Sequence, residues 1–135
     1  MNHLPTIEIP YWISRQFIQK HKELTFIYGD DLTGRAYLGQ AAHCFGETNC
    51  YAIPTKRRMC MNERDAFFND EGFELLWKPV IDIAISRIPR SSPIIPFPRI
   101  GQGDAQLPVR SPKTFRYLTE QINLLAYPAI QWINP

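Results

Sequence analysis

Three segments of the sequence carry residue types that can bind a phosphorylated ligand. The first, at residues 29–39, reads GDDLTGRAYLG and holds three glycines before a helical pattern. The second, at residues 54–58, reads PTKRR and places three adjacent cations after an apolar run. The third, at residues 98–108, reads PRIGQGDAQLP and holds a Gly-x-Gly turn followed by Asp104. Main-chain N–H groups of such turns and of helix starts donate to phosphate oxygens, and cations neutralise them.

Asp104 carries the most specific chemistry in these segments. A carboxylate that follows a Gly-x-Gly turn can accept a hydrogen bond from a ribose hydroxyl or act as a general base. A structural alternative stays open for each segment: the glycines only form turns, the cations are solvated, and Asp104 caps a turn or a helix. The sequence shows no His and Cys residues at metal-binding spacing, so no metal or other cofactor is expected.

Each of the three segments follows an apolar run that is typical of a strand. We expect strands over 24–28, 50–53 and 93–97, the first ended by a polar turn at 29–31 and the second by Pro54. Helical patterns separate these strands, and this alternation predicts an α/β layered domain. Ligands of such folds bind outside the carboxyl ends of the strands. The sequence therefore predicts that the three segments meet at one site.

Apolar residues at helical spacing predict the helices between these strands. We expect helices over 11–21, 37–45 and 112–125, the last capped by Ser111 with Pro112 at its first position. These helices would supply the layers that cover the strands.

A further helix is expected to begin after Asn69 or Asp70, either of which can cap it. Pro79 lacks an N–H group and crowds the preceding turn, so it should kink this helix or mark a restart. The predicted apolar face of the helix consists of Phe73, Leu76, Val80, Ile81, Ala84 and Ile88.

Length and composition indicate one globular domain. The chain has 135 residues, of which 44% are hydrophobic and 21% charged, and its net charge is +2. We treat residues 1–135 as one domain with a lead-in and helix (1–23), a core (24–126) and a tail (127–135) that docks on the body. The charge is too close to neutral to favour a nucleic-acid or membrane-surface protein.

The N-terminus and the cysteines indicate a cytoplasmic protein. The N-terminus lacks the basic and apolar regions of a secretory signal, and no apolar stretch is long enough to span a membrane. Cys44, Cys50 and Cys60 include no Cys-x-x-Cys pair, and ordinary reduced thiols are the simplest interpretation. For a phage-encoded protein the compartment is the host cytoplasm. An oligomer contact through the apolar tail is the alternative to docking on its own chain.

The order of these motifs from about Phe26 to Leu125 resembles the macrodomain-like family, in particular short phage and bacterial proteins of the terminal ADP-ribose–protein hydrolase branch. The segments that carry the resemblance are FIYGDDLTGRAYLGQAAH, CYAIPTKRR and IPFPRIGQGDAQLPVRSPKTFRYL. The closest local matches are Ile53–Lys56 and Pro98–Gly103. The resemblance implies a compact three-layer sandwich, with a mixed or mostly parallel central sheet flanked by helices.

In that family, two glycine-containing loops bind the diphosphate and the distal ribose of ADP-ribose. The resemblance therefore implies Lys56 and Asp104 as candidate catalytic residues, and we expect a purine to stack on Tyr37 or Phe97. Ala105 stands where the hydrolase branch has its catalytic aspartate, which favours a binder over a standard hydrolase. The other expected ligand-binding residues are Asp30, Asp31, Gly39, Gln40, Gly101, Gln102 and Gly103.

Three hypotheses from different classes follow from these motifs. The leading one is binding of ADP-ribose or a related nucleotide, with ADP-ribosyl hydrolase activity as its enzymatic form. The second is a phage protein that sequesters a nucleotide immune signal without cleaving it, which Ala105 favours. The third is a host-protein or nucleic-acid interaction module that uses residues 56–58 and the apolar tail, although no RNA-binding pattern of aromatic and basic residues accompanies them.

Overall fold

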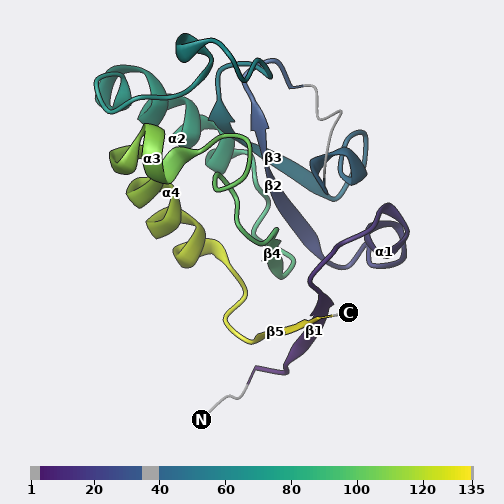
Figure 1. The fold of residues 1–135 in the computed structure, drawn as a ribbon. Coiled ribbons are helices and arrows are strands. Elements are labelled where there is room, and N and C mark those ends of the chain that lie inside the picture. Colours follow the sequence, from purple (N-terminus) through teal and green to yellow (C-terminus); the bar gives the residue numbers. More distant parts are fainter. Residues whose placement is uncertain (1–3, 35–39, 135) are drawn as a thin grey trace.

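The computed structural model describes residues 4–34 and 40–134. Strands and helices alternate along this chain, which confirms the predicted α/β class. Figure 1 shows α1 on one side of the central strands and α2, α3 and α4 on the other. In chain order the elements are β1 (Ile7–Pro10), α1 (Arg15–Lys20), β2 (Thr25–Asp31), η1 (Gln40–His43), β3 (Cys50–Lys56), η2 (Arg64–Ala66), η3 (Phe73–Trp77), α2 (Lys78–Ser86), β4 (Ile94–Pro96), α3 (Leu107–Arg110), α4 (Pro112–Leu125) and β5 (Ile130–Ile133).

The strands pair in parallel in two open sheets. The larger sheet has the strand order β3-β2-β4, so the middle strand, β2, is the first of these three along the chain. The smaller sheet pairs β1 with β5, and the predicted docking of the tail is thereby confirmed. The amide of Tyr127, shortly before β5, donates to the carbonyl of Ile94 in β4 at 2.8 Å and links the two sheets.

The middle strand β2 lies in the hydrophobic core. Phe26 and Ile27 are fully buried, and because successive residues of a strand point to opposite faces, they pack into different layers. Phe26 packs edge-on against Phe17 of α1, with ring centroids 6.2 Å apart. α2 contacts β3 and also α4, so these helices form the second layer over the sheet.

Two strands extend further than the sequence predicts. β2 continues through Asp31 instead of ending in a polar turn, and β3 continues past Pro54 to Lys56. β3 is an edge strand of its sheet, and an edge tolerates a proline because one side of the strand needs no N–H donor. The hydroxyl of Thr55 donates to the main-chain oxygen of Asp30 at 3.2 Å and adds a bond between the two strand ends.

The first two predicted helices are shorter in the structure. α1 begins at Arg15 rather than at Tyr11, because Ser14 is its N-cap and accepts a hydrogen bond from the amide of Phe17 at 3.1 Å. The helix predicted over 37–45 is a 3-10 helix in the part that the structure describes, η1.

Pro79 marks a change of helix type, as predicted. The π-helical η3 ends at Trp77 and α2 begins at the next residue, since a proline nitrogen cannot donate to the preceding turn. Asn69 caps this region by accepting from the amide of Gly72 at 2.8 Å. Leu76 was predicted on the apolar face but is 52% exposed, because the π-helical turn changes the spacing on which that prediction depends.

The C-terminal helix agrees with the sequence in both of its ends. α4 begins at Pro112 and ends at Leu125, and it buries Leu118 in the core. Ser111 stands at the N-cap position, but its side chain does not cap the helix as predicted and pairs with the hydroxyl of Thr114 instead, at 2.6 Å. Asp70, an alternative cap of the preceding helix, instead accepts from the amide of Lys113 at 2.9 Å. The start of α4 is thereby tied to the segment before η3.

Candidate functional site

The carboxyl ends of β2, β3 and β4 meet at one edge of the larger sheet, which we call the carboxyl edge. The chain passes from β2 to β3 on one side and then to β4 on the other side, so the strand order reverses at β2. In open parallel sheets, ligands bind in the crevice at such a reversal, outside the carboxyl ends of the strands. The carboxyl edge is therefore the candidate site.

Asp30 and Asp31, the acidic pair, end β2 at this edge. They are only 9% and 8% exposed, and the Oδ2 atom of each is buried without a hydrogen-bond partner among the described residues. The Oδ1 of Asp30 accepts from the amide of Asp31 at 2.8 Å, and the Oδ1 of Asp31 accepts from the amide of Thr33 at 2.8 Å. Burial raises the pKa of Asp30; the hydrogen bond from the amide of Asp31 opposes this rise, and the charge of Asp31 adds to it.

Lys56 ends β3 at the same edge and is 5% exposed. Its Nζ donates to the carbonyl oxygen of Met59 at 3.3 Å and to the Sδ of Met61 at 3.0 Å. Burial lowers the pKa of Lys56, and the carboxylates of Asp104 and Asp31 oppose this effect. Lys56 therefore shares one electrostatic environment with carboxylates from β2 and from the loop after β4.

The loop after β4, residues 97–106 (the β4 loop), contains two glycines with different roles. Gly101 has a φ of +82°, and a Cβ there would lie 2.7 Å from the Cδ1 of Leu107, so this glycine is required by the fold. Gly103 has no atom within 4 Å of the place where a Cβ would stand. Arg99 has a φ of +62°, and the amide of Gln102 closes the turn by donating to its carbonyl at 2.9 Å. Gly103 is thus the glycine that a ligand can approach.

The structure brings most of the predicted site residues to the carboxyl edge. Phe97 differs, since it is 6% exposed and packs edge-on against Phe26 with centroids 6.4 Å apart, so its ring belongs to the core and is no open stacking surface. Tyr37 and Gly39 lie outside the described residues, and Gln40 is the first residue of η1. The predicted residues at the carboxyl edge are Asp30, Asp31, Lys56, Gly101, Gln102, Gly103 and Asp104.

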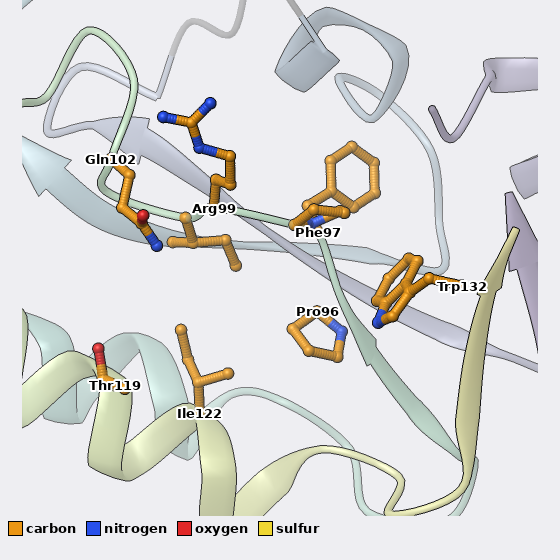
Figure 2. A pocket seen from close by; sticks show the side chains of 9 residues that line it. Pro96, Phe97, Arg99, Gln102, Thr119, Ile122 and Trp132 are labelled. Atoms are coloured by element: carbon orange, nitrogen blue, oxygen red, sulfur yellow. The ribbon is translucent and has the colours of Figure 1, made fainter. Parts of the chain in front are cut away.

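A pocket of about 220 Å³ adjoins the β4 loop. Figure 2 shows β4 and β5 diverging, with Trp132 in the space between them and Pro96 on the side of β4 that faces Ile122 of α4. The walls are mostly apolar, and the polar side chains are those of Arg99, Gln102 and Thr119. The lining residues are Pro96, Phe97, Pro98, Arg99, Ile100, Gln102, Thr119, Ile122 and Trp132.

No sequence signal identifies Phe67, Arg110 or Trp132 as site residues. The guanidinium carbon of Arg110 lies 4.0 Å from the ring centroid of Phe67, and the Nζ of Lys56 lies 4.6 Å from it. Phe67, Arg110 and Trp132 come from distant parts of the chain, and a hydrophobic period, which spans only a few residues, cannot relate them to one another. Trp132 lies in the tail, for which the sequence predicts only docking.

The basic triplet at residues 56–58 does not form one open cationic surface. Lys56 is buried, and Arg58 forms ion pairs with Glu63 and Asp65, the latter at 2.6 Å. Arg57 is exposed, 5.8 Å from a ring centroid of Trp77. Of these three cations, a nucleic acid or protein partner would therefore meet only Arg57 as an exposed side chain without an ion pair among the described residues.

The fold and the site define an α/β domain with parallel strands and a candidate ligand site at their carboxyl edge. The chain belongs to a family of unknown function (DUF7831), whose model matches residues 9–121. No curated protein and no solved structure matches the chain. Within residues 4–34 and 40–134, no three His, Cys, Asp or Glu side chains group as metal ligands, and no helix is long and apolar enough to cross a membrane.

The two glycines of the β4 loop should respond differently to substitution. Gly101→Ala should destabilise the fold by about 1–3 kcal/mol, because it combines a left-handed backbone with a contact against Leu107. Gly103→Ala should change the free energy of unfolding by less than about 0.5 kcal/mol. Urea unfolding measures both, and equal losses would contradict the described turn.

The buried carboxyl of Asp30 should make stability depend on pH. Its pKa in the folded chain is raised above the unfolded value of 3.8, so its contribution to stability is full below that value and is lost as the pH rises through the folded pKa. Asp30→Asn should therefore be more stable than the parent near pH 7, by about 1 kcal/mol, and this advantage should shrink in acid.

Urea unfolding between about pH 4 and pH 7 measures this difference. Glu71→Gln, at an exposed position, removes a carboxylate without burial and should match the parent throughout. An advantage of Asp30→Asn that grows toward acid would contradict the assignment.

Proposed function

We propose that this chain is a macrodomain-like protein that binds ADP-ribose or a related nucleotide at the carboxyl edge. The proposal depends on one observation: the edge holds buried carboxylate oxygens without hydrogen-bond donors next to a buried lysine without an ion pair, among the described residues. The Oδ2 atoms of Asp30 and Asp31 need hydrogen-bond donors, and Lys56 is a buried cation at the end of the neighbouring strand. A sugar nucleotide brings hydroxyl donors and phosphate anions together, so it can satisfy both.

The main chain of the β4 loop supports phosphate contacts. The amides of Gly103 and Asp104 form no main-chain hydrogen bond within the described residues, and the space around Gly103 is open. Free amides in a turn are donors for phosphate oxygens. The parallel sheet with helices on both sides is compatible with the three-layer sandwich that the resemblance implies.

The pocket beside the β4 loop supports a place for the base of the ligand. Because Phe97 packs into the core, a planar ring would instead lie against the apolar wall that includes Pro96, Ile122 and Trp132. The side chains of Arg99 and Gln102 border this wall and can bind the polar edge of a base.

ADP-ribosyl hydrolysis is a second candidate function, and the electrostatic coupling of Lys56 with Asp104 favours it. Asp104 is exposed, so its carboxylate can orient a ribose hydroxyl or a water molecule in a bound ligand.

Isothermal titration with ADP-ribose tests the binding proposal. The parent chain should give a saturable isotherm, and Gly103→Val should weaken binding by about tenfold or more, because its side chain occupies the approach to the loop. Arg116→Gln, at an exposed position on α4, should bind as the parent does. Absence of heat with ADP-ribose, NAD, ADP and cyclic ADP-ribose isomers would overturn the proposal.

Mass spectrometry after incubation with an ADP-ribosylated peptide separates binding from hydrolysis. If the chain is a hydrolase, free ADP-ribose should accumulate, and Asp104→Asn should slow its release by about a hundredfold while ADP-ribose binding persists. Recovery of intact peptide and intact nucleotides would exclude hydrolysis and favour sequestration.

A further inference from the structure

Two cations near the carboxyl edge pack against one buried ring. Phe67 is 2% exposed, and its main chain forms an antiparallel bridge with that of Lys56. The Nζ of Lys56 lies 4.6 Å from the centroid of this ring, and the guanidinium carbon of Arg110 lies 4.0 Å from it. Since the face of an aromatic ring attracts cations, Phe67 contacts both positive groups.

Neither cation has a counter-ion within ion-pair distance in the described part of the chain. The ion pairs formed there involve other basic residues. Burial is the main cause that lowers the pKa of Lys56; the carboxylates of Asp104 and Asp31 oppose this effect, and the positive charge of Arg110 adds to it. Two like charges held together in this way are stabilised when an anion joins them.

Arg110 is oriented before any ligand arrives. It is the last residue of α3 and half-buried, and its Nε donates to the side-chain oxygen of Gln106 at 3.0 Å. Gln106 has a φ of +51°, a conformation that is costly for a residue other than glycine. The hydrogen bond and the ring fix the guanidinium group, and its terminal amino groups form no hydrogen bond among the described residues. Such paired N–H groups match two oxygens of one phosphate.

We propose that Lys56 and Arg110, held by Phe67, form an anion site that takes a phosphate group of the ligand. The identity of the whole ligand rests on the proposed function, whereas the anion site follows from these three side chains. A phosphate fits better than a carboxylate, because a group with more than one negative charge can neutralise both cations.

Isothermal titration of the full chain with inorganic pyrophosphate and with ADP-ribose tests this site. Arg110→Gln should weaken the binding of both by about tenfold or more, because a charge-assisted, paired contact is lost. Arg110→Lys keeps the charge but loses the paired N–H groups, so its loss should be intermediate. Arg116→Gln removes an equal charge from an exposed position on α4 and should leave both affinities unchanged.

The outcomes separate the anion site from the proposed function. Equal pyrophosphate binding by Arg110→Gln and the parent, or no pyrophosphate binding by the parent, would overturn the anion site even if ADP-ribose binds. Pyrophosphate binding that depends on Arg110, without binding of any nucleotide, would support the anion site and overturn the proposed function. If circular dichroism shows that Arg110→Gln does not fold, Arg110→Lys serves as the test variant instead. If Arg110→Lys binds pyrophosphate as tightly as the parent, the paired contact between the guanidinium group and the phosphate is overturned.

Discussion

Parallel pairing of β2 with both β3 and β4 is the constraint on which the rest of the structure depends. The hydrogen bonds of a parallel ladder require neighbouring strands to run in one direction, so all three strands end at the same edge. The connections between them carry helices that cover both faces and bury residues such as Phe26 and Ile27. This pairing brings Asp31, Lys56 and the β4 loop together, although they are far apart in the sequence.

The carboxyl edge keeps polar groups that an isolated domain would be more stable without. A buried acceptor without a donor costs on the order of 1–3 kcal/mol, and the acidic pair has two such oxygens. Lys56 and Arg110 add two cations without a close counter-ion among the described residues. Free-energy costs of this kind are common in binding sites, where a bound ligand supplies the missing partners. Because the two signs lie on different strands, the nucleotide that we propose as ligand would lie with its hydroxyl groups near β2 and its phosphate near β3.

Local backbone chemistry explains which sequence predictions of the fold were right. Pro79 changes the helix type and Pro112 begins α4 as predicted, because a missing N–H group acts within one turn. The predicted cap by the side chain of Ser111 was wrong, since Asp70 from a distant segment bonds the first turn of α4 instead. The predicted strand ends at 29–31 and at Pro54 were wrong. Polar and proline residues favour turns locally, but pairing with a buried neighbour carried both strands further, and the edge position of β3 tolerates the proline.

The sequence by itself determined the order of the three central strands, the helical segments between them and the three segments that follow these strands, because hydrophobic periodicity, glycine and proline act over a few residues. It also singled out Lys56 and Asp104. It did not predict β5 or α3. Only the tertiary structure decided that the ring of Phe97 belongs to the core, that Phe67 carries two cations, and that β4 and β5 diverge around a pocket. Each of these features is a contact between distant segments, and strand pairing and packing of the whole chain fix such contacts, whereas local spacing does not.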